Sequence, residues 1–378
     1  MAVNRPYHEQ IDIRNTKKLR ELEATLPPFL FYFFRGIEPN TSSRTRIAYA
    51  YDLRVFFDYL VENHPFFKGK DVRSLEVSSL ENVKPIDLEA YMDYLKYYTS
   101  EDGEEHINHA RGLMRKISAI KTMYNYFYQK EMVESNPAAR IPLPKIPQKE
   151  IIRLDIDEVA ELLDQVESGE KLSEKQQAFH EKTKNRDLAM LSLLLGTGIR
   201  VSECVGLDIK DVDFQNMGVH VHRKGGKEAI VYFSDEVADA LEVYYDERKT
   251  LVPRAGYEDA FFLSLQMRRI NVRSVENLVK KYAMTVTTLK KITPHKLRST
   301  YGTSLYQETN DIYLVASVLG HSDVNTTKKH YAATNDYMLR SQRNAVKLRE
   351  KLPDKDAGKE PEPEAASKKD DPDNKTDE

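Results

Sequence analysis

The segment from Thr293 to Tyr331 combines side chains that can bind a phosphate and attack it. His295 and Arg298 are three residues apart, a spacing that places both side chains on one face of a helix. His321 follows in a Leu-Gly-His turn, and the tyrosine comes ten residues later. Arginine binds phosphate through two parallel hydrogen bonds, histidine transfers protons near neutral pH, and a tyrosine oxygen can form a covalent intermediate. Taken singly, each residue has an ordinary structural explanation, so it is the ordered set that predicts a reactive site.

HKLR at 295–298, LGH at 319–321 and the tyrosine ten residues later resemble the C-terminal signature of the tyrosine recombinases, the phage-integrase family. That family also has an upstream arginine in a glycine-rich turn followed by Ser-Glu, which GTGIRVSE at 196–203 matches. Three motifs in the family's order are far more specific than any one of them alone.

The resemblance implies a role for each matching residue. Arg200 and Arg298 would stabilise the charge on the nonbridging phosphate oxygens. Tyr331 would attack the scissile phosphorus to give a 3′-phosphotyrosyl enzyme and a 5′-hydroxyl. His295 would act as a general base or hydrogen-bond partner, and His321 would donate a further hydrogen bond to the phosphate. Arginines replace metal in this chemistry, and the protein–DNA ester conserves the bond energy, so no metal, ATP or other cofactor is expected.

The proton for the leaving 5′-oxygen comes, in the family, from a lysine on a sheet hairpin. Lys224 in RKGGKE matches that lysine, and Lys227 is the competing candidate. Glu203 is expected to orient an active-site arginine or histidine, with a surface charge as the alternative.

The match departs from the family's pattern next to the nucleophile. Many members have a histidine two residues after the tyrosine, whereas this chain has Ala333 there and His330 before the tyrosine. Tyr337 is an alternative nucleophile, although its spacing from His321 differs from that of the family.

The apolar pattern of residues 1–135 predicts a helical domain, which the resemblance identifies as a SAM-like core-binding domain. Residues 1–25 are polar and give no prediction, whereas 26–37 are apolar enough to pack on the helices expected over 41–63, 85–98 and 106–130. His106 and His109 have the spacing of two metal ligands, but no third ligand accompanies them, so no metal site is predicted. Basic side chains beside the apolar faces are expected to contact DNA, with a solvated surface as the alternative: Arg44, Arg46, Arg54, Arg111, Arg115, Lys116 and Lys121.

Four prolines within residues 136–149 predict an extended linker without helix, in which Arg140, Lys145 and Lys149 are expected to follow the duplex. The catalytic domain is expected over 150–352. It should be mainly helical, with a small antiparallel sheet from 207–213, 217–222 and 228–233 and a basic hairpin tip at 223–227. Helices are expected from Asp155, over 185–195, from Arg200, and over 235–248 and 271–284. The last helix, 336–352, is expected to pack on a neighbouring subunit, and 353–378 is a charged tail of disordered composition.

The charge balance bears on the expected DNA partner. The net charge is −3, and residues 351–378 hold six lysines against ten acidic residues, which leaves 51 basic and 50 acidic residues elsewhere. Binding to DNA must therefore rest on local clusters of positive charge. The one cysteine, Cys204, excludes an internal disulfide, and no apolar run approaches the ~20 residues of a membrane helix. The N-terminus has no apolar signal core, so a bacterial cytoplasmic protein is expected.

The resemblance thus implies a site-specific DNA recombinase, Xer-like or of the transposon type. It should act as a homo-tetramer on two double-stranded DNA sites through a Holliday junction. A type IB topoisomerase and a non-catalytic DNA-binding regulator are the alternatives. The target sequence and any accessory protein are left open.

Overall fold

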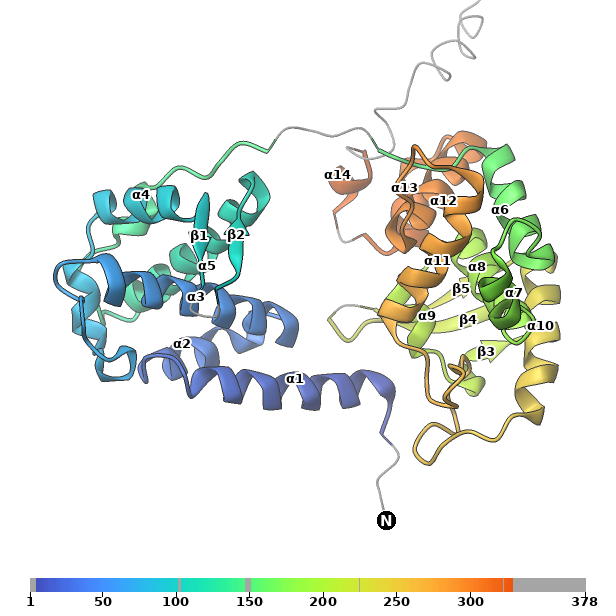
Figure 1. Cartoon of the computed structure of the whole chain (residues 1–378), viewed down its shortest axis with the longest axis horizontal. Coiled ribbons are helices and arrows are strands. Elements are labelled where there is room, and N and C mark those ends of the chain that lie inside the picture. Colours follow the sequence, from blue (N-terminus) through green and yellow to red (C-terminus); the bar gives the residue numbers. More distant parts are fainter. Residues whose placement is uncertain (1–4, 101–102, 147–150, 224, 322, 329–378) are drawn as a thin grey trace, which may run out of the picture. The chain divides into compact units, whose positions relative to one another are not determined.

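The computed structural model describes residues 5–100, 103–146, 151–223, 225–321 and 323–328 (Figure 1). Within them, buried apolar side chains form two large cores, one built from residues 19–141 and the other from residues 154–297. None of the described helices combines the length and the apolar character needed to cross a bilayer. The predicted helix at 336–352 and the tail at 353–378 lie outside the described residues.

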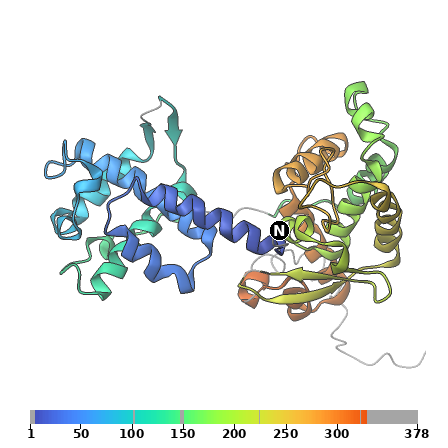
Figure 2. The ribbon, with the colours of Figure 1, turned by 90° about the horizontal axis from the view of Figure 1, so that it is seen from below.

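The N-terminal part, defined here as residues 5–146, consists of helices and one small hairpin. Its α-helices are α1 (Tyr7–Glu23), α2 (Leu30–Ile37), α3 (Ser43–Asn63), α4 (Pro85–Tyr94) and α5 (Ala110–Gln129). Short 3₁₀ helices are Glu38–Asn40, Val72–Ser74, Val77–Asn82 and Pro137–Arg140. Strands β1 (Tyr97–Thr99) and β2 (Glu105–Ile107) pair antiparallel and extend beyond the helices that carry them (Figure 2).

Several predicted boundaries in this part were wrong. Residues 7–23, for which no element was predicted, form a polar helix whose Leu19 and Leu22 are buried. The helix predicted over 85–98 ends at Tyr94, because the aromatic and β-branched residues at 97–99 pair with 105–107 as a hairpin. The helix predicted from 106 accordingly begins at Ala110.

Lys116 does not lie on an exposed basic edge as predicted. Its side chain is buried and its Nζ lies 3.4 Å from Oδ1 of Asp52, whose carboxylate is itself buried. Arg115 completes the cluster from the surface side, 2.8 Å from the same oxygen. Burial lowers the pKa of Lys116 and raises that of Asp52, and the pairing opposes both shifts. This lysine therefore joins α3 to α5 and is unavailable to DNA.

The proline-rich stretch is less extended than predicted. Pro137 occupies the first turn of a 3₁₀ helix that the Asn136 side chain caps, a position where the missing N–H of proline costs nothing. Ala138 and Ile141 are buried in the N-terminal core. The prediction of no helix here was wrong, and the packing of this part continues to Ile141.

The C-terminal part, residues 151–328, contains most of the predicted elements. Its α-helices are α6 (Ile156–Ser168), α7 (Glu174–His180), α8 (Lys184–Thr197), α9 (Val201–Gly206), α10 (Asp235–Thr250), α11 (Val272–Val286), α12 (Pro294–Thr309), α13 (Ile312–Leu319) and α14 (Val324–Thr327). α6 begins where predicted, and Asp155 and Glu158 form a capping box at its start. The predicted strand 207–213 is reduced to β3 (Val212–Asp213), because residues 209–211 form a 3₁₀ turn.

The small sheet has the order β3–β4–β5 and is antiparallel throughout. β4 (Gly218–His222) pairs with β5 (Glu228–Tyr232) in a register that places His222 opposite Glu228. Val219, Val221 and Val231 are buried in the C-terminal core. Because side chains alternate along a strand, His220 and His222 project from the opposite, outer face.

Helix α8 is the centre of the C-terminal part. It is buried almost all round from Ala189 to Leu195 and packs on α6, α9, α10 and α12. A helix that is apolar on every side can be accommodated only inside a core. It ends at Gly198, which adopts φ +63°, and a Cβ there would lie 2.4 Å from a ring carbon of Tyr301. Glycine is thus required both by the backbone conformation and by the close approach of α12.

Candidate active site

Arg298 lies on α12 and is held by the C-terminal ends of two other helices. Its Nη1 donates a 2.6 Å hydrogen bond to the carbonyl oxygen of Gly198, and its Nη2 donates to that of Leu319. The side chain is buried. Burying a charge is costly unless it is compensated, and carbonyls at helix C-termini carry the partial negative charge that compensates it. α8 and α13 thereby fix the position of this guanidinium.

Arg200 is positioned by its own turn of chain. Its backbone N–H donates to Oε2 of Glu203 at 2.8 Å, and its Nη1 donates to Oε1 at 2.7 Å. The carboxylate is buried, whereas the guanidinium is about one-third exposed at 35%. Nη2 reaches the carbonyl oxygen of Gly320 at 3.4 Å. Glu203 thus contacts both the backbone and the guanidinium of Arg200, as a carboxylate that orients this arginine must do.

A third arginine joins this group, and the sequence did not predict it. Arg223, the first residue after β4, donates from Nη2 to the carbonyl of Val318 at 2.6 Å and from Nη1 to that of Ser317 at 3.3 Å. Its Nε is buried without a hydrogen-bond partner among the described residues. Desolvation lowers the pKa of this guanidinium, an effect that nearby Arg200 reinforces and Glu203 opposes. The sequence offered one signal, an arginine beside Lys224, but it gave no hint of the contact with α13.

The three arginines converge on the last turn of α13, because they donate to four consecutive carbonyls, those of residues 317–320. That turn is a Schellman motif. Gly320 is left-handed at φ +62°, its N–H donates to Ser317, and the His321 N–H donates to Ala316. A side chain on Gly320 would meet Arg223 at 2.2 Å. The turn therefore gathers three positive charges into one small region, the type of site that can bind a phosphate.

The two histidines of the set occupy different environments. His295 lies in the first turn of α12 and is exposed, whereas Arg298, on the next turn, is buried. His321 follows the Schellman turn, and its Nδ1 lies 2.7 Å from Oγ1 of Thr327 on α14. Five residues named in the sequence analysis lie outside the described residues: Lys224, His330, Tyr331, Ala333 and Tyr337. The site described here therefore consists of the arginines, Glu203 and the two histidines.

The cysteine adjoining Glu203 is not a second nucleophile. Cys204 is buried in α9, and its burial raises the pKa of the thiol far above its ordinary value. Only a thiolate is an effective nucleophile, so this side chain serves packing.

The basic side chains predicted to contact DNA fall into two groups. Arg46 is 2.5 Å from Oε1 of Glu38 and its side chain is only 12% exposed, while Arg115 is paired with Asp52. Lys121 is half-buried. The exposed members are Arg44, Arg54, Arg111 and Arg140.

Comparisons with known proteins identify the family of this chain. Residues 153–338 match the Phage integrase family. The tyrosine recombinase XerC of Caldanaerobacter subterraneus subsp. tengcongensis is 32% identical over 342 residues, which cover 86% of this chain and 88% of that protein. The tyrosine recombinase XerS of Streptococcus uberis is 30% identical over 359 residues, covering 87% and 97%.

Solved structures show the same fold. The XerH site-specific recombinase bound to palindromic difH substrate matches with a TM-score of 0.59 at 19% identity, covering 81% of each chain. The Tn1549 transposon integrase in complex with circular intermediate DNA gives a TM-score of 0.58 at 20% identity, covering 82% of this chain and 96% of that chain.

The chain belongs to the phage integrase family and is a tyrosine-type site-specific DNA recombinase. The predicted family and the mainly helical fold with small antiparallel sheets are confirmed. The relatives do not favour a type IB topoisomerase or a non-catalytic regulator.

Proposed function

We propose that this recombinase cuts and rejoins double-stranded DNA at a specific site through a 3′-phosphotyrosyl bond to Tyr331. The observation that carries the proposal is the convergence of Arg200 and Arg298 on the end of α13, where they contact the carbonyls of Gly320 and Leu319, eleven and twelve residues before that tyrosine in the chain. In the proposed reaction, exchange of one pair of strands between two duplexes gives a Holliday junction, and exchange of the other pair resolves it.

The proposed cleavage step requires no cofactor, because one phosphorus–oxygen bond forms as another breaks. The phenolic oxygen of Tyr331 attacks phosphorus, the bond from phosphorus to the 5′-oxygen breaks, and the new bond joins the 3′-phosphate to tyrosine. Arg200 and Arg298 stabilise the charge on the nonbridging oxygens, which is the main catalytic contribution available for such a transfer. His295 accepts the phenolic proton as the new bond forms, and His321 donates a hydrogen bond to the phosphate. Religation reverses the step with a 5′-hydroxyl as the nucleophile.

Lys224 is proposed to donate a proton to the leaving 5′-oxygen. Lys224→Ala should slow cleavage by about 10²–10⁴-fold, the usual contribution of a general acid. A substrate with sulfur at the bridging 5′ position should restore cleavage, because a thiol with a pKa of about 8.5 leaves without a proton. Rates of covalent-complex formation on both substrates would check this. Lys227→Ala, the matched control, should cleave both substrates like the wild type, and rescue confined to Lys227→Ala would assign the role to Lys227 instead.

DNA is the proposed partner of both parts of the chain. XerH and the Tn1549 integrase have been solved with DNA, and their fold matches this one. Residues 1–135 are proposed as the core-binding domain and 150–352 as the catalytic domain, joined by the 136–149 linker. The exposed Arg44, Arg111 and Arg140 supply local positive charge for phosphate contacts in a chain whose net charge is −3.

The active assembly is proposed to be a homo-tetramer in which residues 336–352 pack on a neighbouring subunit. Deleting 336–378 should abolish the synaptic complex of two DNA duplexes while leaving binding of a monomer to one half-site intact. Native gel shifts with one and two labelled duplexes measure both states. Unchanged synapsis in the deletion variant would refute subunit exchange through this segment.

The proposed reaction is tested with a suicide substrate. A nick close to the cleavage position lets the 5′-hydroxyl fragment diffuse away, so that the covalent complex accumulates. Incubating the wild-type chain with nicked duplexes carrying candidate sites should give a denaturant-resistant protein–DNA band that protease removes. The 3′ end of the cleaved strand should be blocked and the 5′ end should accept phosphate from a kinase. Tight, site-specific binding without any covalent band would overturn the proposal.

A further inference from the structure

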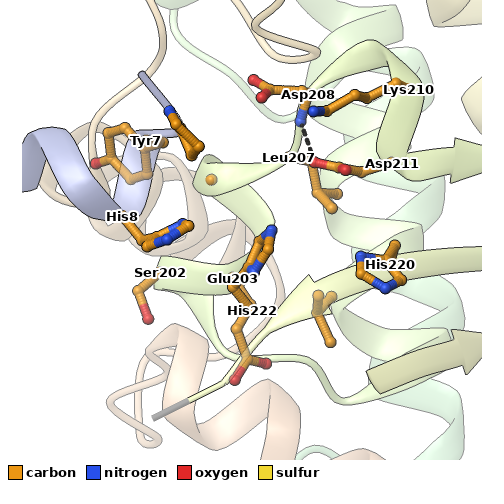
Figure 3. A pocket seen from close by; sticks show the side chains of 13 residues that line it. Tyr7, His8, Ser202, Glu203, Leu207, Asp208, Lys210, Asp211, His220 and His222 are labelled. Carbon is orange, nitrogen blue, oxygen red and sulfur yellow. Dashed lines mark hydrogen bonds between the residues drawn. The ribbon is translucent and has the colours of Figure 1, made fainter. Parts of the chain in front are cut away.

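The outer face of the small sheet carries a group of metal-ligand side chains that the recombination chemistry does not use. His220 and His222 project from β4, and Asp211 lies at the end of the 3₁₀ turn that precedes β3. One donor atom from each of the three side chains lies within 4.8 Å of the other two. Figure 3 shows both imidazoles on the side of the strand that Asp211 also faces. We propose that these three residues bind a divalent transition-metal ion, Zn²⁺ being the best match.

The chemistry of the donors indicates the class of ion. Two imidazoles with one carboxylate are a ligand set that zinc, cobalt and nickel accept, whereas calcium and magnesium require mostly oxygen. Zinc with ligands at about 2.0–2.1 Å needs donor atoms about 3.4 Å apart in a tetrahedral site. The donor atoms, at most 4.8 Å apart, can reach this spacing by side-chain rotation, because both histidines are partly exposed and can turn.

Asp211 is the most firmly held of the three ligands. The residue is buried, and one of its oxygens, Oδ2, accepts a 2.9 Å hydrogen bond from the backbone N–H of Asp208. This bond fixes the carboxylate and leaves Oδ1 to coordinate the ion. Carboxylates that ligate metals are usually hydrogen-bonded in this way, which keeps them oriented toward the ion.

Glu228 is placed to supply a fourth donor. It lies directly across from His222 in the register of β4 and β5. Its Oε1 is 3.2 Å from Nδ1 of His222, and its Oε2 is 3.6 Å from Nε2 of His220. The carboxylate thus already contacts both imidazoles, and a small movement would bring it onto a shared ion.

An ion bound here would join the two strand ends from which the 223–227 hairpin emerges. His222 is the last residue of β4 and Glu228 is the first of β5. The next pair along the hairpin is held by a 2.6 Å hydrogen bond from Arg223 N–H to the Lys227 carbonyl. The ion would take no part in the cleavage chemistry. Its effect would be to suppress opening of the hairpin that contains Lys224.

Direct binding of Zn²⁺ and Co²⁺ to the untagged full-length chain, without DNA, tests the site independently of recombination. Equilibrium dialysis should find one Zn²⁺ bound per chain, and Co²⁺ should give the visible absorption bands of a four-coordinate nitrogen and oxygen site. His220→Gln and His222→Gln should each weaken Zn²⁺ binding by about 100-fold or more, since even loss of a supporting partner costs 10–100-fold. Asp211→Asn should weaken it too, and thermal unfolding would show whether that buried position still folds.

His106→Gln is the matched control. It removes a partly exposed strand histidine from the hairpin β1–β2, whose imidazole contacts Ser100 at 2.9 Å. It should leave Zn²⁺ binding unchanged. Trypsin cleavage within 223–227 should slow about tenfold when free Zn²⁺ is ten times its Kd, because bound ligand reduces the open population by that factor. Equal Zn²⁺ binding by wild type and the His220→Gln/His222→Gln double variant would overturn the proposal, as would no stoichiometric binding by wild type.

Discussion

Replacing Tyr331 with phenylalanine should reduce the covalent protein–DNA complex on a nicked suicide substrate by about 10⁴-fold or more, the cost typical of removing a nucleophile. Phenylalanine has nearly the same shape but lacks the oxygen that must bond to phosphorus. Denaturing gels measure the covalent complex, and gel shifts of the same samples measure binding without covalent attachment. Binding should change little, because in the proposed complex the arginines and histidines, not the phenol, hold the phosphate.

Tyr337→Phe is the matched control, since it removes a phenol six residues further along the chain. It should form the covalent complex at the wild-type rate. A complex that survives Tyr331→Phe and disappears with Tyr337→Phe would mean that the spacing of the family signature does not apply to this chain, and that Tyr337 is the nucleophile.

Arg298→Lys should slow covalent-complex formation by about 10²–10³-fold, the effect of removing one preorganised donor to transition-state charge. Lysine keeps the positive charge but presents a single ammonium, so it cannot donate to the carbonyls of Gly198 and Leu319 in the geometry of the guanidinium. Single-turnover rates on the suicide substrate give the size of the effect. Both the charge and the buried position are retained, so the fold should persist.

Arg248→Lys controls for the general cost of altering a buried arginine. Arg248 is also buried, and it donates to the carbonyls of Ala260 at 3.0 Å and Glu258 at 2.7 Å, whereas Arg298 donates to those of Gly198 and Leu319. The two variants should lower the unfolding temperature by comparable amounts, and only Arg298→Lys should slow cleavage. Equal rates for Arg298→Lys and wild type would exclude this guanidinium from the transition state.

Local patterns in the sequence were sufficient to predict most of the helices and strands of the C-terminal part. The capping box of Asp155 and Glu158, the glycine that ends α8, and the alternation in β4 and β5 are each encoded within a few residues. These signals are local, so they survive without knowledge of the tertiary fold. The N-terminal helix α1 had no such signal, because just two of its residues, Leu19 and Leu22, are buried.

Long-range contacts were beyond the reach of sequence reasoning. Lys116 was expected at the surface because lysines usually are, but its partner Asp52 lies 64 residues earlier in the chain. Arg223 was assigned to a basic hairpin tip, whereas its hydrogen-bond acceptors are 94 and 95 residues further on. Arg200 and Arg298 were identified as candidates only through the match to the family signature, because local sequence patterns do not predict contacts between residues far apart in the chain.

The acceptors of the three arginines are carbonyls of the main chain, and this affects which mutations the site can tolerate. Side chains at Ser317, which is exposed, and Val318, which is half-buried, can be exchanged without altering the oxygen atoms that the guanidiniums contact. Substitutions at these two positions are therefore expected to leave the arginine contacts in place. Gly320 has no such latitude, since any side chain there collides with Arg223 and opposes the left-handed backbone. During divergence, the arginine-binding turn is thus constrained at one glycine while its neighbours remain open to adaptation.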